Sequence, residues 1–116
     1  MISRKVIAGD TFSIVYYHKQ GDTIADLPEG YDYVIGLRQE DGKTVTSFKY
    51  SKNEIQKIAT GTYRWQIDYE LSKTLKDVVI AEMLVYSIDK AFVQHCNEPI
   101  RIEVIPSFMN DVIEEE

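Results

Sequence analysis

Residues 61–70 alternate between apolar and polar side chains, and this alternation constrains the fold more than any other feature of the sequence. Tyr63, Trp65, Ile67 and Tyr69 occupy every second position, and the residues between them are polar or charged. Successive side chains of a β-strand point to opposite faces of its sheet, whereas a helix would scatter these four residues around its circumference. The segment therefore predicts a strand with one buried face and one face in contact with water.

The same period of two recurs along most of the chain. Strands with this alternation are predicted at residues 11–18, 31–39, 44–50 and 100–104, and a short first strand is predicted at residues 5–8. Residues 78–88 are more continuously apolar, as expected of a central strand that is covered on both sides or lies at a subunit contact. The dipeptide Asp41–Gly42 lies between two of these segments and predicts a tight hairpin. A chain of 116 residues has room for a single core. About seven short strands with turns between them predict an all-β fold, a two-sheet antiparallel sandwich that is immunoglobulin-like in broad shape. A small barrel is the structural alternative.

Helical signals are few in this sequence. Ser51 is followed three residues later by Glu54, which matches the capping box of a helix N-terminus. We therefore expect one short helical turn near residues 51–58. Residues 72–77 fit a polar loop better than a second helix.

The C-terminal end differs in composition from the rest of the chain. We expect a β-sandwich domain over residues 1–107 and an acidic tail over residues 108–116. The tail contains one apolar pair, Val112 and Ile113, among polar and acidic residues. It is either a frayed terminus or an arm that docks on a neighbouring subunit, in which case this apolar pair forms the contact.

The charge balance excludes several classes of partner. The formal net charge is −6, and the tail residues Asp111, Glu114, Glu115 and Glu116 account for four of these charges, which leaves −2 for the rest. Binding to nucleic acid requires Lys and Arg gathered on one face, and the longest basic cluster is Arg4–Lys5. We therefore expect no nucleic-acid partner and no membrane partner.

Cys96 is the single cysteine, so no disulfide can form within the chain, which fits synthesis in a reducing cytoplasm.

The residue types that carry catalysis or bind metals are sparse. His18, His95 and Cys96 are the candidates for a nucleophile, a base or a zinc site, but they form no paired motif. His95 and Cys96 are adjacent, and adjacent residues of a strand point to opposite faces, so they would not meet as thiol and base. We expect no catalytic residue, no metal site and no cofactor. Four acidic residues favour a solvated loop over a loose calcium site: these are Asp22, Asp26, Glu29 and Asp32.

Eight tyrosines are many for a chain of this size. A tyrosine joins an apolar ring to a polar tip, so it suits both sheet packing and binding surfaces. Tyr17 is the best candidate for an interface, because its side chain falls on the face opposite Phe12, Ile14 and Tyr16.

The order of several short segments resembles a known family. These are Gly9–Asp10–Thr11–Phe12, then residues 26–31 with the sequence DLPEGY, then residues 60–67 with the sequence TGTYRWQI, and a closing PIRIEV at residues 99–104. The succession is similar to small immunoglobulin-like domains of tailed-phage virion proteins, notably the N-terminal domain of the baseplate upper protein family. The likeness covers residues 5–105, and the segments 51–58 and 87–97 depart from it.

The resemblance implies a structural protein without catalytic activity. In that family the domain anchors an appendage or decorates the particle, so a virion location is expected, in the baseplate, neck, tail or capsid decoration. The protein would be made in the cytoplasm of the bacterial host and would contact other virion proteins or copies of itself in a homo- or hetero-oligomer. No binding residue transfers, because the shared residues are turn and core positions.

A carbohydrate-binding β-sandwich module is the alternative function, with exposed tyrosines and Trp65 stacking on sugar rings. The position of Trp65 in the inward-facing row counts against it. A small enzyme is a third alternative. A closed cavity lined by both His18 and His95 would overturn the structural interpretation.

Overall fold

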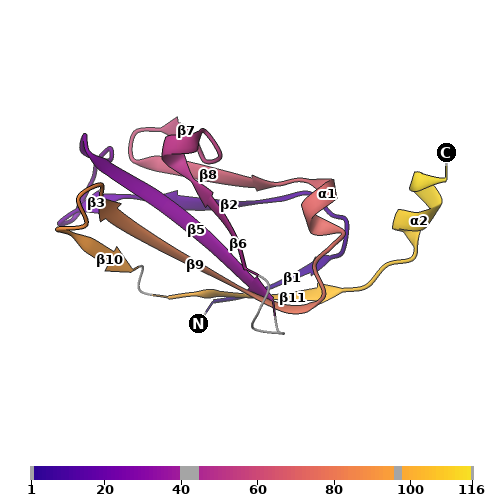
Figure 1. Cartoon of the computed structure of the whole chain (residues 1–116). Coiled ribbons are helices and arrows are strands. Elements are labelled where there is room, and N and C mark those ends of the chain that lie inside the picture. Colours follow the sequence, from indigo (N-terminus) through magenta and orange to yellow (C-terminus); the bar gives the residue numbers. More distant parts are fainter. Residues whose placement is uncertain (1, 40–44, 96–97, 116) are drawn as a thin grey trace.

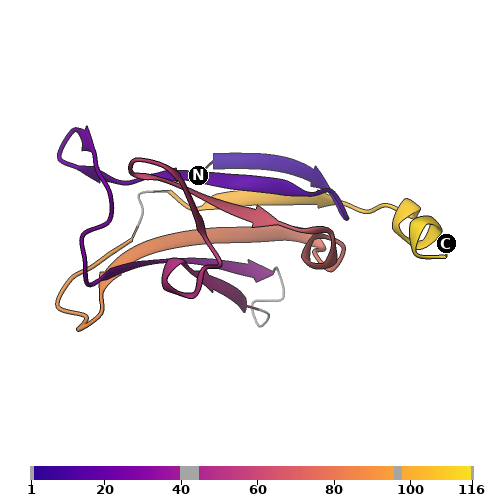
Figure 2. The same ribbon diagram turned by 90° about the horizontal axis from the view of Figure 1, so that it is seen from above.

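The chain is mostly β-structure, arranged as several sheets with two short α-helices in a sandwich-like architecture. The computed structural model describes residues 2–39, 45–95 and 98–115. Figures 1 and 2 show two layers of strands facing each other, with the C-terminal helix at one end of the molecule. The expected two-layer, all-β arrangement is therefore observed in its coarse form.

Over the described residues, the larger sheet contains six strands. Its order is β1 (Ile2–Ile7), β11 (Ile100–Ile105), β9 (Asp77–Ser87), β5 (Tyr31–Gln39) and β6 (Val45–Lys49), and β10 (Val93–His95) also pairs with β9. All neighbours run antiparallel except β1 and β11, which are parallel over six residue pairs from Ile2 opposite Ile100 to Ile7 opposite Ile105. β1 and β11, which come first and last in chain order, therefore lie side by side (Figure 1).

The smaller sheet covers one face of the larger one. It consists of β2 (Phe12–Tyr17), β8 (Thr62–Ile67) and β7 (Gln56–Ala59), in that order. A separate two-stranded hairpin, β3 (Lys19–Gln20) with β4 (Thr23–Ile24), extends from the end of β2. The seven predicted strands are all present among the described residues, and β3, β4, β7 and β10 are strands that the periodicity did not predict.

The alternation in β8 builds the core between the two sheets. Tyr63, Trp65 and Ile67 are 2%, 1% and 0% exposed, and the intervening residues are less buried. They meet the inward residues of the larger sheet, which are fully or almost fully buried. These include Ile35, Leu37, Val79, Ala81 and Ile102. Aromatic rings interlock across the layers, with ring centroids 4.8 Å apart for Tyr33 and Tyr63 and 4.7 Å apart for Phe48 and Trp65.

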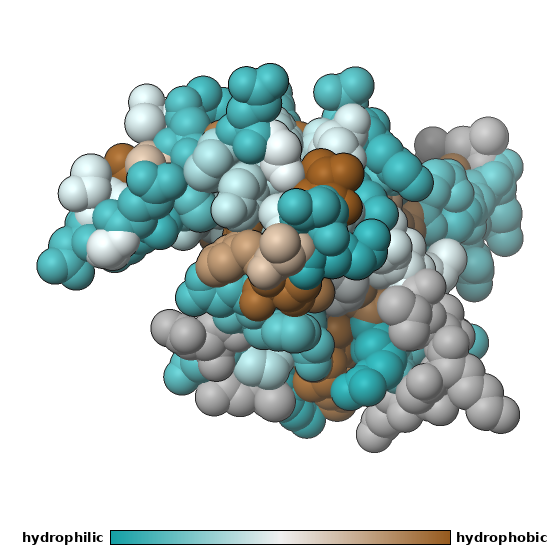
Figure 3. Space-filling model, turned by 60° about the vertical axis from the view of Figure 1, so that its left-hand side comes forward, coloured by the Kyte–Doolittle hydropathy of each residue, from teal (hydrophilic) through white to brown (hydrophobic). Residues whose placement is uncertain are grey.

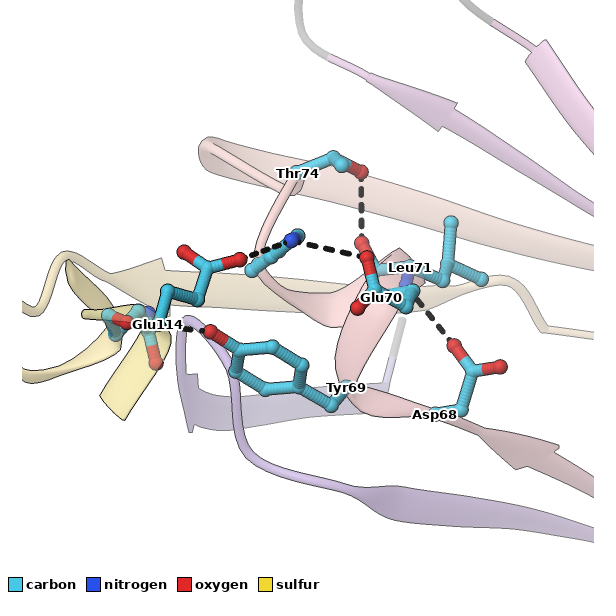
Figure 4. Close-up of polar contacts among 8 residues, drawn as sticks. Asp68, Tyr69, Glu70, Leu71, Thr74 and Glu114 are labelled. Atoms are coloured by element: carbon cyan, nitrogen blue, oxygen red, sulfur yellow. Dashed lines mark hydrogen bonds and ion pairs between the residues drawn. The ribbon is translucent and has the colours of Figure 1, made fainter. Parts of the chain in front are cut away.

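The predicted strand at residues 61–70 is too long, because a helix cap ends it. The side chain of Asp68 accepts a hydrogen bond of 2.9 Å from the Leu71 backbone N–H, which starts the short helix α1 (Tyr69–Ser72) (Figure 4). Tyr69 is thus a helical residue rather than the fourth member of the buried row. Residues 72–77 form no helix beyond Ser72, in agreement with the predicted loop.

The expected helical turn is present but shorter than predicted. It is a 3₁₀ turn, η1 (Tyr50–Lys52), and Ser51 lies inside it instead of capping it. Ser51 donates its hydroxyl to Asp32 Oδ2 at 2.5 Å, and Glu54 Oε1 accepts from the Lys49 backbone N–H at 3.1 Å. The segment that follows is the strand β7. The Asp41–Gly42 hairpin and Cys96 lie outside the described residues.

We predict that the inward residues of the smaller sheet hold the two layers together. Ile67→Ala should lower the free energy of unfolding by about 2–5 kcal/mol, because it leaves a cavity in a site with no exposure, and Ile67→Val should cost about 0.5–1.5 kcal/mol. Ile58→Ala in β7, where the side chain is 45% exposed, should cost less than about 0.5 kcal/mol. Urea denaturation followed by tryptophan fluorescence measures all three. Equal losses for Ile58→Ala and Ile67→Ala would contradict the assigned core.

Candidate functional site

Tyr17 lies at the free edge of the smaller sheet. Its side chain is 61% exposed, while Phe12, Ile14 and Tyr16 on the same strand are buried. Within the described parts of the chain, β2 pairs with β8 on one side and with no strand on the other. The His18 backbone N–H donates to the Gly61 carbonyl at 2.7 Å, so the backbone N–H and C=O groups of the even-numbered residues of β2 point toward β8. The backbone groups of Val15 and Tyr17 therefore point away from β8, toward the free edge.

An aromatic groove of about 490 Å³ opens next to Tyr17. It is formed where the ends of β2 and β3 approach the start of β5 and the strand β10. The groove is lined by Tyr16, Tyr17, His18, Lys19, Gln20, Pro28, Tyr31, Tyr33, Val85, Phe92, Gln94 and His95. Figure 3 looks onto this end of the molecule, where hydrophobic surface lies below a projecting hydrophilic lobe.

The groove combines flat apolar faces with polar groups at its rim. The rings of Tyr31 and Phe92 lie 5.7 Å apart, and Phe92 is 42% exposed. The amides of Gln20 and Gln94 lie in exposed positions. Lys19 adds a positive charge, and none of the described lining residues is acidic. Such a surface fits apolar side chains or a sugar ring, preferably with negative charge nearby.

Both histidines line this groove, although they are far apart in the sequence. His95 is exposed on β10, whereas His18 packs edge-on against Tyr33 with ring centroids 5.8 Å apart. Nε2 of His18 is buried and has no hydrogen-bond partner among the described residues. Burial lowers the pKa of His18 below its usual value of 6.5. The groove is open to solvent along the exposed side chains of Tyr17, Phe92 and His95, so it is not the closed cavity that would overturn the structural interpretation.

The predicted tail contains a helix that is tied to the domain by its polar side chains. The helix α2 spans Met109–Glu114. Asn110 Nδ2 donates to the Ala8 carbonyl at 2.8 Å, and the Asn110 carbonyl accepts from the Tyr69 hydroxyl at 3.4 Å. Lys73 forms ion pairs with Glu114 and Glu70, and these hydrogen bonds raise its pKa (Figure 4). A Cβ at Gly9, where φ is +97°, would lie 2.1 Å from Asn110 Oδ1, so this contact needs glycine.

The apolar side chains of the C-terminal segment face away from the domain. Val112 and Ile113 are 43% and 51% exposed, and the preceding Phe108 and Met109 are 75% and 51% exposed. Val112 and Ile113 were predicted as contact residues from the sequence, whereas Phe108 and Met109 were not. Their shared helical face is the signal that would have revealed all four.

The acidic residues of the loop at 22–32 do not converge on one point. Asp26 accepts hydrogen bonds from Lys57 Nζ at 2.8 Å and from the Gly61 backbone N–H at 2.7 Å, and these bonds lower its pKa. Asp32 departs from the expected solvated loop, because it is the second residue of β5 and is 1% exposed. It accepts from the backbone and hydroxyl of Ser51 and from the Tyr86 hydroxyl. Over residues 2–39, 45–95 and 98–115, no group of three or more His, Cys, Asp or Glu side chains is placed to hold a metal ion.

Comparison with known protein family models, curated proteins and solved structures finds no match to this chain. Among the described residues, neither α-helix has the length and apolar character needed to cross a membrane. The groove, the strand edge and the C-terminal helix are therefore the features that bear on function.

We predict that His18 makes the stability of the domain depend on pH. The folded-state pKa is below 6.5, so the unfolded chain binds this proton at a higher pH than the folded chain does. The free energy of unfolding should be unaffected by this group above pH 6.5 and should fall as the pH drops from there through the lowered pKa. His18→Gln should remove this part of the pH profile, and His95→Gln should retain it. An NMR titration that places the His18 pKa at or above 6.5 would contradict the prediction.

We also predict that Asn110 holds α2 against the domain. Asn110→Ala removes a hydrogen bond worth about 1 kcal/mol, so amide hydrogen exchange in residues 109–115 should be about fivefold faster. The melting temperature should not change, because the core is elsewhere. Asp111→Ala is the matched control in the same helix and should leave the exchange near its original rate. Unchanged exchange in Asn110→Ala would show that the contact does not hold the helix.

Proposed function

We propose that this chain is an immunoglobulin-like structural domain of a tailed-phage virion that works through protein–protein contacts and has no catalytic activity. The strand order supports the immunoglobulin-like part of the proposal. The order β11-β9-β5-β6 corresponds to strands G-F-C-C′ of such a sandwich, and β2-β8-β7 corresponds to B-E-D. The sequence resemblance to small domains of phage virion proteins supports the virion location.

The observation that carries the proposal is the exposure of apolar side chains at both ends of the molecule. Phe108, Met109, Val112 and Ile113 are at least 43% exposed on the C-terminal segment. Tyr17 and Phe92 are exposed at the groove, at the opposite end. Clustered apolar exposure is typical of surfaces that another protein covers. Two such surfaces on one small domain suit a component that is contacted on two sides.

In a structural role, small contact surfaces can be enough for stable assembly. A protein present in many copies gains affinity from several simultaneous contacts, because each later contact is intramolecular. The partners are other virion proteins or further copies of this chain. The protein would be synthesised in the cytoplasm of the bacterial host and then incorporated into the baseplate, neck, tail or capsid decoration.

Carbohydrate binding is the second candidate, and the aromatic groove is the observation that favours it. Tyr17 and Phe92 offer exposed rings, and Gln20 and Gln94 offer amide groups that can bond to sugar hydroxyls. Trp65 cannot take part, because it is 1% exposed in the core.

The deciding experiment asks whether the chain is a component of particles. Particles of the phage that encodes it are purified by density gradient, and the protein is quantified against the major capsid protein. We expect several copies per particle and labelling at one structure by immunogold microscopy. A glycan array with the purified chain runs alongside, with Tyr17→Ala and Phe92→Ala as controls. Absence from particles, together with glycan binding that both variants lose, would replace the structural proposal with the carbohydrate-binding one.

A further inference from the structure

The C-terminal segment of residues 108–115, here called the arm, places its polar side toward its own domain and its apolar side toward solvent. Asn110 and Glu114 are four residues apart, share one helical face, and make the contacts to Ala8 and Lys73. A terminal helix that packs on its own domain normally buries its apolar side instead. The apolar side of the arm is therefore available to a second molecule.

The exposed apolar residues of the arm form one continuous stripe. Phe108, Met109, Val112 and Ile113 follow the spacing i, i+1, i+4 and i+5, which gathers them on one side of the helix. Asp111 and Glu115 flank the stripe and are exposed. This is the pattern of a helix that lays apolar anchors into a groove on its partner.

The aromatic groove is complementary to the arm in both polarity and charge. Its wall offers the rings of Tyr31 and Phe92 to apolar side chains, and Tyr17 stands at its rim. Lys19 places a positive charge at the groove, and the described lining contains no carboxylate. The arm contains carboxylates and no basic residue. Opposite charges around an apolar contact favour this pairing over either surface pairing with itself.

The arm and the groove of one molecule cannot meet. Figures 1 and 2 place α2 at one end of the molecule and β3, β4 and β10 at the other. The molecule is 47 Å long, and Asn110 holds the arm at its own end. Any contact between arm and groove must therefore join two molecules.

We propose that the arm of one copy docks in the aromatic groove of the next copy, head to tail. A symmetric contact between two arms would place the carboxylates of both helices together, which is unfavourable. A head-to-tail contact uses two different surfaces, so an open assembly keeps a free arm at one end and a free groove at the other, and it grows into a ring or a filament. This inference rests on the proposed function and names a second copy of the chain as the partner.

The test uses one variant for each surface. Val112→Asp disables the arm, Phe92→Asp disables the groove, and Ile58→Asp in β7 is a control that places the same charge at an exposed apolar position belonging to neither surface. Circular dichroism confirms that each variant is folded. Sedimentation velocity over a concentration series should show wild type and Ile58→Asp assembling beyond a dimer. Val112→Asp and Phe92→Asp alone should self-associate at least about tenfold more weakly.

Mixing the two defective variants gives the sharpest result. Val112→Asp retains its groove and Phe92→Asp retains its arm, so a mixture should form a dimer with one copy of each and should grow no further. A mixture that stays monomeric while wild type assembles would overturn the inference and would point to another contact, such as pairing along the β2 edge. A wild-type chain that stays monomeric but is present in particles would also overturn it, while leaving the proposed function intact. Absence from particles would instead count against the proposed function.

Discussion

The burial of one face of β8 against the larger sheet is the interaction on which the rest of the structure depends. Aromatic side chains bury more apolar surface than any others, about 150–250 Å² each, and Tyr63 and Trp65 bury theirs almost completely. The smaller sheet has three strands among the described residues, and its apolar face is buried against the larger sheet. Its register is fixed because a shift by one residue would turn Trp65 toward solvent. The same register pairs β2 with β8, and it thereby fixes the position of the end of β2, where the groove lies.

Carboxylates fix the segments that the core does not reach. Asp32 joins β5 to the turn at Ser51, and Asp26 joins the loop before β5 to Lys57 and Gly61 in the smaller sheet. Asp68 starts the helix α1, which then supports the arm through Tyr69 and Lys73. Each of these carboxylates is satisfied by backbone N–H groups or side-chain donors, as groups near a protein interior must be. The loops around the two candidate surfaces are thus held by hydrogen bonds between segments distant in the sequence.

The strands that could be predicted from the sequence are those that bury one face. Their alternation depends only on neighbouring residues, so β5 was predicted with its observed bounds. The strands β3, β4, β7 and β10 are exposed along their length, and no burial pattern reveals them. Tyr69 was misplaced because the Asp68 side chain accepts a hydrogen bond from the Leu71 backbone N–H and starts a helix where the alternation continues. The groove could not be predicted, because its lining residues are distant in the sequence and only the tertiary structure brings them to one place. Tyr17, Val112 and Ile113 are exposed, and their role as contact residues stays a prediction.

The parallel pairing of β1 with β11 has a mechanical consequence. The arm continues from the C-terminal end of β11, and β1 begins at the opposite end of the same ladder. Tension between the arm and the N-terminal end of β1 would run along the strands, at right angles to the hydrogen bonds that join them. All bonds of the ladder would then share the load in shear, instead of breaking one after another as they do when a strand is peeled away. A force transmitted through the arm would thus meet the domain along its most resistant direction.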